Sequence, residues 1–280
     1  MHNADFGTGV NGKATAMRRV VFNQKGGVGK STIACNLAAI AAAGGERALV
    51  VDLDVQANST RYLLGDAADD AGDGVAGFFE RTLGFSMRSP SLTDHVVATP
   101  FEGVALLPAS AALDELHGKL ESRYKIYKLR DALAEVGADY DSVWIDTPPA
   151  LNFYTRSALI AAERCLIPFD CDDFSRRALY ALLETVDEIR ADHNAALAVE
   201  GIVVNQFQPR ATLPQRMVQE LVDEGLPVLQ PYLSASVKVK ESHERALPLI
   251  HLDARHKLTQ EFVALHQALA GRQRRRARGG

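Results

Sequence analysis

A glycine-rich stretch, QKGGVGKS at residues 24–31, constrains the fold of this chain more than any other feature. It lies between a β-branched run and a helical pattern, which is the setting of a phosphate-binding loop. The usual pattern for such a loop is G-x-x-x-x-G-K-[ST], and here Gln24 stands where the first glycine belongs. Lys25 follows it directly and is a second lysine in addition to Lys30. The sequence therefore predicts a nucleotide site with one more cation than usual.

Apolar runs and helical patterns alternate along the chain. The runs predict strands at 19–23, 48–54, 104–109, 142–147, 164–169, 201–207 and 227–233, and the patterns predict helices at about 30–43, 125–136, 154–162, 175–191, 212–224 and 256–270. Several runs are continuously apolar, as expected for strands that are covered on both faces. We therefore predict an α/β fold, a P-loop NTPase with a doubly wound, mostly parallel sheet and helices on both faces.

The composition divides the chain into three parts. We expect a flexible leader over residues 1–17, a single domain over 18–270 and a basic, disordered tail over 271–280. The tail holds five arginines and no acidic residue, although the whole chain has a net charge of −4. The positive charge available for an anionic partner is therefore local, because the chain as a whole is slightly acidic.

The glycines of the loop permit backbone angles that turn successive N–H groups toward an anion. The helix that begins near Lys30 adds its positive end, and the Lys30 ammonium group should reach the β- and γ-phosphates. Ser31 should bind Mg²⁺, and Thr32 can hydrogen-bond the α-phosphate. The alternative is a plain glycine turn before a helix, which the complete strand–loop–helix setting disfavours.

Three aspartates follow strands on the side of the sheet where the loop is expected. Asp52 and Asp54 are two residues apart at one strand end and so share a face, and Asp146 ends another strand. Nucleotide hydrolysis with magnesium needs carboxylates that hold the ion and orient the attacking water. Each aspartate alone could instead cap the next turn. The three together predict a metal and catalytic site at the carboxyl ends of the strands.

Three segments of the chain together resemble a known family. KGGVGKST, VDLDVQANST and WIDTPPAL are similar to the signatures of the ParA/MinD branch of deviant Walker-A ATPases. Within that branch, the glutamine after DLDV, the DTPP turn and the stretch IPFDCDDFSRRALYALLE resemble the ParA-type DNA-partition ATPases most closely. The resemblance runs from about residue 18 to residue 270, and it implies that the central domain is a deviant Walker-A ATPase domain.

The resemblance implies a role for each site residue. Lys25 would reach across a dimer to the phosphates bound by the other subunit, and Asp54 would position the hydrolytic water; with Lys30 they form the implied catalytic group. Asn205 would face the adenine. The implied Mg²⁺ ligands are Ser31, Asp52 and Asp146. The implied nucleotide site comprises Lys25, Gly26, Gly27, Val28, Gly29, Lys30, Ser31, Thr32 and Asn205.

The resemblance also implies a function. Members of this family bind ATP and Mg²⁺, form a sandwich dimer and then bind DNA without sequence specificity. A ParB-type centromere-binding partner stimulates their weak hydrolysis and releases the dimer. We therefore expect a cytoplasmic ATPase of plasmid or chromosome segregation that associates with the nucleoid when ATP is bound.

The segment SASVKVKESHERALPLI corresponds to a region of the family that carries DNA-contacting basic residues. The candidates here are Lys238, Lys240 and Arg245, and the alternative is that they form only a solvated helix face. Arg176 and Arg177 are weaker candidates. The arginine tail is a further basic element, which we expect to make an auxiliary DNA contact.

Two other kinds of protein share this loop. A membrane-associated positioning ATPase of the MinD kind would need a basic amphipathic helix at its C-terminus. The last predicted helix instead has an apolar stripe along one face, which consists of Leu258, Phe262, Leu265 and Leu269. We expect this stripe to pack on the sheet, so we expect no contact with a membrane. A metal-cluster reductase would need paired cysteines. The spacing of the three cysteines instead predicts reduced thiols of a cytoplasmic protein, at Cys35, Cys165 and Cys171.

Overall fold

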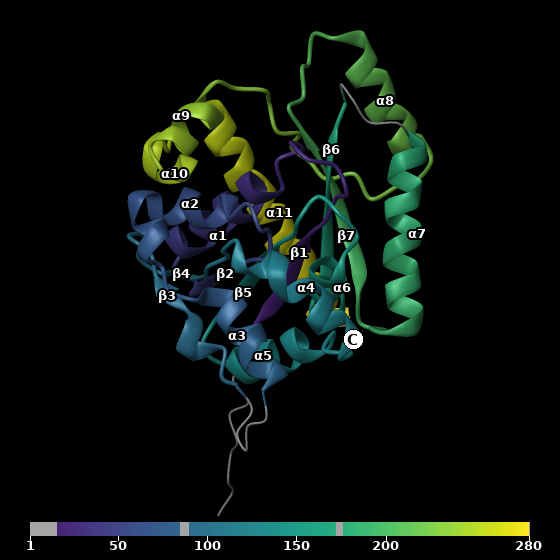
Figure 1. The fold of residues 1–280 in the computed structure, drawn as a ribbon. Helices are drawn as coiled ribbons and strands as arrows, with labels where there is room; N and C mark the ends of the chain where they lie inside the picture. Colours follow the sequence, from purple (N-terminus) through teal and green to yellow (C-terminus); the bar gives the residue numbers. More distant parts are fainter. Residues whose placement is uncertain (1–15, 85–89, 172–175, 280) are drawn as a thin grey trace, which may run out of the picture.

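A computed structural model describes residues 16–84, 90–171 and 176–279, with side chains up to Arg272. A seven-stranded sheet in the order β3-β4-β2-β5-β1-β6-β7 forms its centre (Figure 1). The strands are β1 (Met17–Val21), β2 (Ala48–Asp52), β3 (Val97–Ala98), β4 (Val104–Leu107), β5 (Ser142–Asp146), β6 (Arg164–Asp170) and β7 (Ala198–Asn205). Neighbouring strands run parallel except for β3, which pairs antiparallel with β4. The predicted mostly parallel α/β sheet is confirmed.

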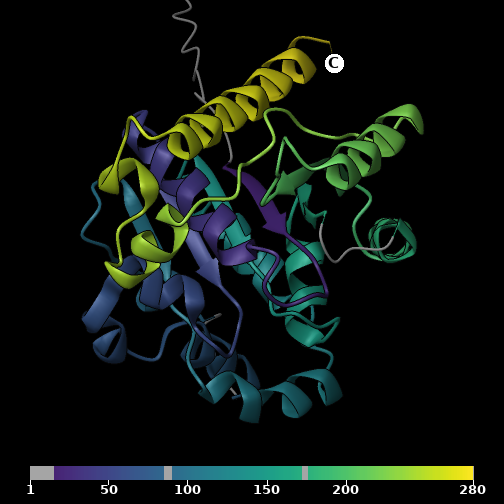
Figure 2. The same ribbon diagram turned by 90° about the horizontal axis from the view of Figure 1, so that it is seen from above.

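Helices cover both faces of the sheet, as Figure 2 shows from above. One face is covered by α1 (Lys30–Ala43), α2 (Asn58–Leu64), α10 (Leu249–Leu252) and α11 (Lys257–Gly279). The other is covered by α3 (Gly74–Leu83), α4 (Ala112–Ser122), α5 (Lys128–Val136), α6 (Phe153–Ala161), α7 (Arg176–Asp192) and α8 (Thr212–Asp223). The short helix α9 (Lys238–Glu244) lies beside α10. Two short 3₁₀ helices span Gly65–Asp70 and Thr93–His95.

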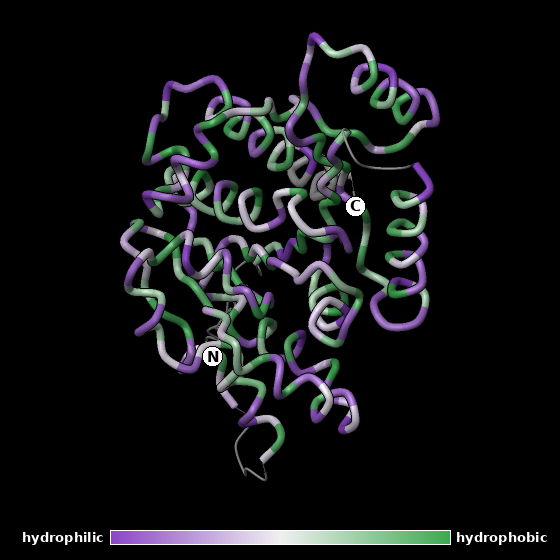
Figure 3. Tube along the Cα trace, turned by 45° about the horizontal axis from the view of Figure 1, so that its top comes forward, coloured by the Kyte–Doolittle hydropathy of each residue, from purple (hydrophilic) through white to green (hydrophobic). Residues whose placement is uncertain are grey.

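Each face of the sheet has its own hydrophobic core. Successive strand residues point to opposite faces, so Val20 packs in one core and Val21 in the other. The apolar stripe of α11 is buried in the same core as Trp144 of β5, which confirms the predicted packing of Leu258, Phe262, Leu265 and Leu269. Figure 3 shows green hydrophobic stretches along the chain inside the molecule, whereas purple hydrophilic stretches are frequent in the outer turns. In the described part of the chain, no helix is both long and apolar enough to cross a membrane.

The strand predicted at 227–233 is wrong. This segment runs beside β7 but makes only isolated parallel bridges, between Ile202 and Val228 and between Phe207 and Ser234. Pro227 and Pro231 have no N–H group to donate, so two positions of this segment cannot contribute a ladder hydrogen bond. The sheet therefore ends at β7, and the segment lies along its edge.

The predicted boundaries at both ends of the chain also change. Ala16 is buried and Met17 begins β1, so the last two residues of the expected leader over 1–17 belong to the folded domain. Residues 1–15 lie outside the described residues. The backbone of residues 271–279 continues α11 instead of forming a disordered tail. Arginine, glutamine and alanine favour helix, and no proline interrupts them. The single domain over 18–270 remains a prediction.

Candidate nucleotide site

The glycine-rich loop lies between β1 and α1, at the carboxyl end of the sheet (Figure 1). Gly27 and Gly29 have φ angles of 77° and 90°, a left-handed conformation that glycine adopts without strain. A Cβ atom at position 29 would also lie 2.5 Å from the Nδ2 atom of Asn205. Asn205 ends β7, and its Nδ2 atom donates a hydrogen bond to the backbone carbonyl of Val28 at 3.0 Å. Glycine at position 29 therefore lets β7 hold the loop in place.

Lys30 is the first residue of α1, and its buried side chain folds back over the loop. Its Nζ atom donates to the backbone carbonyl of Lys25 at 2.9 Å. Burial lowers the pKa of the Lys30 ammonium group, and the charges of Asp146 and Asp54 oppose that shift. The loop thus places a cation beside the free N–H groups at the start of α1, an arrangement that binds phosphate.

Asp52 and Asp146 end the neighbouring strands β2 and β5 and lie opposite each other in register. Both carboxyl groups are fully buried. Burial is the main cause that raises the pKa of each, and the charge of Asp146 raises the pKa of Asp52 further. Two adjacent buried carboxylates favour a nearby cation, because the ionisation of both would otherwise leave unbalanced charge in the interior.

The two carboxylates differ in their hydrogen bonds. Both oxygens of Asp52 are occupied: Oδ2 accepts from the backbone N and the Oγ1 of Thr60 at 2.9 and 2.8 Å, and Oδ1 accepts from the backbone N of Asp54 at 3.1 Å. The Oδ2 atom of Asp146 accepts from the Ser59 hydroxyl at 2.8 Å. Its Oδ1 atom has no hydrogen-bond partner among the described residues. Asp146 is therefore the carboxylate with an oxygen available to a metal ion.

These residues fit a magnesium ion that is held mainly by a bound nucleotide. Among the described residues, no three or more His, Cys, Asp or Glu side chains are grouped to hold a metal ion. Magnesium at nucleotide sites commonly takes one or two protein ligands and completes its shell with phosphates and water. Ser31 and Asp146 offer such ligands, and Ser31 is one of the groups that lower the pKa of the Asp146 carboxyl group.

A cavity of about 270 Å³ opens over the loop. It is lined by Gly26, Gly27, Gly29, Lys30, Ser31, Thr32, Asp54, Gln56, Asn58, Pro149 and His243. The structure therefore brings most of the predicted loop residues together with Asp54. The remaining predicted residues lie outside this lining: Lys25 is half-buried, Val28, Asp52 and Asp146 are buried, and Asn205 lines a neighbouring cavity.

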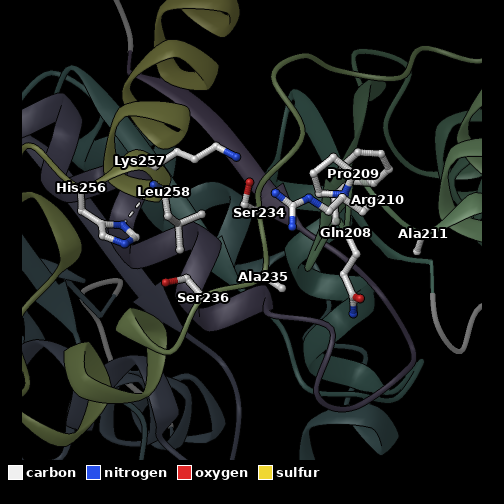
Figure 4. Close-up of a pocket in the computed structure, with 11 residues that line it drawn as sticks. Gln208, Pro209, Arg210, Ala211, Ser234, Ala235, Ser236, His256, Lys257 and Leu258 are labelled. Carbon is white, nitrogen blue, oxygen red and sulfur yellow. Dashed lines mark hydrogen bonds between the residues drawn. The ribbon is translucent and has the colours of Figure 1, made fainter.

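Two further cavities continue from the first one. The second, of about 210 Å³, shares Thr32 with the first cavity and includes Asn205 and Lys240. The third, of about 390 Å³, shares the backbone segment 234–236 with the second. In Figure 4, the side chains of Arg210 and Lys257 extend into this third cavity from opposite sides of Ser234. Sequence reasoning missed both residues, because they come from separate segments that only the fold brings together.

His243 is another residue of the site that the sequence did not indicate. It lies in the last turn of α9, and its Nε2 atom is 2.8 Å from the Oγ1 atom of Thr32. Its ring stacks on Tyr62 with the centroids 4.0 Å apart and the planes 14° from parallel. Burial lowers the pKa of His243, which favours the neutral imidazole. No local spacing could reveal this contact, because the two hydrogen-bonded residues are 211 positions apart.

The predicted DNA-contacting residues lie on α9 or next to it, and they differ in their ion pairs. Glu241 lies 2.8 Å from the Nζ atom of Lys238 and 3.5 Å from the Nη1 atom of Arg245. Lys240 is exposed and forms no ion pair within the described part of the chain. Within the part of the chain that the structure describes, Lys240 is therefore an unpaired lysine beside two cations, Lys238 and Arg245, that share Glu241.

The other basic candidates are placed less favourably. Arg176 forms ion pairs with Glu220 and Glu224 of the α8 region at 2.5 and 3.0 Å. Arg177 is exposed. Arg272, the first arginine of the tail, donates to the backbone carbonyl of Glu200 in β7 at 2.8 Å. The side chains of the remaining tail arginines lie outside the described residues.

Known proteins resemble this chain over most of its length. A family model described as "AAA domain" matches residues 18–199. The chain is 30% identical over 262 residues to the chromosome partitioning protein ParA of Caulobacter vibrioides, covering 91% of this chain and 94% of the relative. It is 31% identical over 272 residues to the chromosome partitioning protein ParA of Myxococcus xanthus, covering 95% of this chain and 93% of the relative. The fold is also similar to a solved structure of cobyrinic acid a,c-diamide synthase from Mycobacterium smegmatis with bound ATP analog and magnesium. The comparison gives a TM-score of 0.78 and 27% sequence identity, and it covers 91% of this chain and 94% of the synthase chain.

Proposed function

This chain belongs to the ParA/MinD family of P-loop ATPases, and on that premise we propose that it is an ATP-driven DNA-partition ATPase for a plasmid or a chromosome. It binds ATP, forms a dimer and then binds DNA without sequence specificity. A ParB-type centromere-binding protein stimulates its weak hydrolysis and releases the DNA. One observation carries this proposal: Thr32 of the phosphate loop and Lys240 of α9 line the same cavity. Nucleotide and DNA would therefore bind to adjoining parts of one structural unit.

The cavity over the loop would hold the phosphates of MgATP. The loop N–H groups and Lys30 would balance the charge of the β- and γ-phosphates, and the Thr32 hydroxyl would donate to the α-phosphate. The adjoining cavity beside Asn205 would take the adenine, while Asn205 itself fastens the loop through Val28. Magnesium bound by Ser31 and Asp146 would supply further charge neutralisation at the phosphates.

Hydrolysis would depend on one residue of the chain's own cavity and on one residue from a second copy. Asp54 lines the cavity, and its Oδ1 atom accepts a hydrogen bond from the backbone N of Gln56 at 3.0 Å. This contact holds the carboxylate so that it can orient a water molecule toward the γ-phosphate. Lys25 lies outside the lining of its own cavity and would contact the phosphates of the other subunit.

The DNA surface would be centred on α9. Lys240 supplies an exposed cation, and Lys238 and Arg245 add charge that Glu241 partly balances. Exposed Arg210 and Lys257 line the third cavity (Figure 4) and extend this basic surface beyond α9. Separate lysine and arginine contacts of this kind bind phosphates without reading sequence, and each one adds to the salt dependence of binding.

The alternative of a MinD-like membrane-associated ATPase receives no support from α11. Its four large apolar side chains are at most 1% exposed and belong to the core. Lipid binding through this stripe would require α11 to leave the sheet. We therefore place the protein in the cytoplasm, on the nucleoid when ATP is bound.

The decisive experiment measures DNA retention with ADP, with ATP and with a non-hydrolysable ATP analogue, each at two salt concentrations. We expect binding with the analogue, weaker or no binding with ADP, and a loss of binding at the higher salt concentration. A parallel arm measures co-sedimentation with anionic liposomes. Binding to the liposomes without retention of DNA would contradict the proposal and would favour the MinD-like alternative.

A further inference from the structure

His243 connects the nucleotide site to α9 through a hydrogen bond that the proposed function does not use. The Nε2 atom of His243 and the Oγ1 atom of Thr32 are 2.8 Å apart, and both residues line the cavity over the loop. Lys238 and Lys240 belong to the same short helix as His243. The contact therefore joins the residue expected to meet the α-phosphate to the helix expected to meet DNA.

The surroundings of His243 hold its ring in place. The ring stacks on Tyr62, whose hydroxyl group hydrogen-bonds Ser242 and accepts from the Nδ2 atom of Asn36 at 3.0 Å. Asn36 also donates to the backbone carbonyl of Thr32 at 2.8 Å and accepts from the backbone N of Leu249 at 2.7 Å. α1, α2, α9 and α10 thus meet in one hydrogen-bonded group, in which a change at Thr32 can act on α9.

The chemistry of the Thr32 hydroxyl gives this contact a direction. A hydroxyl group has one hydrogen to donate and can also accept. When its hydrogen is donated to a phosphate oxygen, the bond to His243 must be donated by the Nε2–H group of the imidazole. The phosphate then polarises the hydroxyl oxygen and strengthens the bond that it accepts from His243. Without a phosphate, either partner can donate, and this added strength is lost.

We infer that His243 is a positioning residue that transmits the occupancy of the nucleotide site from Thr32 to α9, an inference that rests on the proposed function. The α-phosphate is present in both ADP and ATP, so this contact reports that a nucleotide is bound but does not report which one. The distinction between ADP and ATP must then arise at the γ-phosphate, where Lys25 and Asp54 are expected to act.

The first test is hydrogen exchange of the full chain with and without ADP, which requires neither DNA nor a dimer. In the natural chain, ADP should slow the exchange of backbone amides in the loop, residues 26–33, and in the α9 region, residues 238–247. In His243→Phe, which keeps a ring against Tyr62 but removes the hydrogen bond, ADP should protect the loop alone. In His243→Gln, whose side-chain amide can donate, protection of the α9 region should return. A matched control is His251→Phe, because His251 also stacks on an aromatic ring, that of Phe101, with the centroids 4.7 Å apart.

The second test is a double-mutant cycle on ADP affinity. His243→Phe and Thr32→Val should each weaken ADP binding, and we expect about a fivefold to tenfold loss for His243→Phe, the range for one hydrogen bond. Because His243 acts through the Thr32 hydroxyl, the double variant should bind ADP no more weakly than Thr32→Val alone.

The outcomes separate this inference from the proposed function. Equal protection of the α9 region in the natural chain and His243→Phe, or losses that multiply in the double variant, would overturn the role of His243 and leave the proposed ATPase intact. The same loss of α9 protection in His251→Phe would also overturn it, because the effect would then be general. If the natural chain does not bind ADP, both the inference and the proposed function are wrong.

Discussion

The Nζ atom of Lys30 donates a hydrogen bond to the backbone carbonyl of Lys25, at 2.9 Å, so the two lysines of the loop are connected through the main chain of one and the side chain of the other. Lys30 fixes the backbone at position 25 through a carbonyl group that any residue would supply. The lysine side chain at position 25 must therefore serve a purpose other than this bond. A substitution at Lys25 keeps this carbonyl, whereas a substitution at Lys30 removes both the hydrogen bond and the buried charge.

Lys25→Ala should therefore separate nucleotide binding from assembly. We expect ADP affinity within about threefold of the natural chain, because a side chain outside the cavity adds little to binding within one subunit. The proposed ATP-dependent dimer should weaken by at least about 30-fold, since the truncation would remove the proposed contact of Lys25 with the phosphates of the other subunit. Sedimentation velocity with a non-hydrolysable ATP analogue measures the dimer, and Lys30→Ala, which should lose nucleotide binding altogether, is the comparison. An unchanged dimer in Lys25→Ala would remove the cross-subunit role.

Asp54→Ala should stop turnover without preventing ATP binding. The carboxylate lines the cavity, and its loss removes the group expected to orient the attacking water. Such groups contribute roughly 10²–10⁴-fold to rate. Steady-state release of phosphate measures turnover, and ATP-dependent dimerisation shows that binding survives. Turnover within a few-fold of the natural rate would assign the water to another residue.

Glu241→Gln should strengthen DNA binding. The carboxylate of Glu241 lies near both Lys238 and Arg245, and Lys238 is the main cause of its lowered pKa. Removing the acid frees two cations for DNA phosphates, so we expect a several-fold gain in affinity and a steeper dependence on salt. The matched control is Glu244→Gln, which makes the same charge change on the same helix at a residue without an ion pair among the described residues. Equal gains in both variants would show a general charge effect instead.

Asp52→Asn should change how stability depends on pH. Burial, together with the charge of Asp146, raises the pKa of Asp52 from 3.8 to about 8. Because the folded state keeps a proton that the unfolded chain loses, the stability that this group contributes is present at low pH and is lost as pH rises toward 8. The slope is at most about 1.4 kcal/mol for each pH unit. Asparagine cannot ionise, so the melting temperature of the variant, minus that of the natural chain, should increase from pH 5 to pH 8 without nucleotide. A constant difference would show that Asp52 does not titrate in this range.

Much of the fold follows from local patterns in the sequence. Apolar runs predicted six of the seven strands, and several of these runs are continuous because their strands are buried on both faces. The loop signature indicated the candidate nucleotide site, because the spacing of its glycines and lysine is a local pattern of a few residues. The prediction failed at 227–233, where Pro227 and Pro231 remove two N–H donors. It also missed the strand β3 and the helices α2, α3, α4, α9 and α10. Of these, β3, α2, α9 and α10 are too short to show a clear period.

The sequence by itself determined most of the strands, the phosphate loop and the identity of the charged side chains, because these depend on neighbours along the chain. Only the tertiary structure decided which distant residues meet. It showed that both carboxylate oxygens of Asp52 accept hydrogen bonds from Thr60 and Asp54, whereas one oxygen of Asp146 has no partner among the described residues. It also showed that Asn205 donates a hydrogen bond to the loop and that His243 contacts Thr32. These contacts join segments that are far apart in the sequence, and the packing of helices on the two faces of the sheet sets their geometry. No local pattern along the chain records that packing.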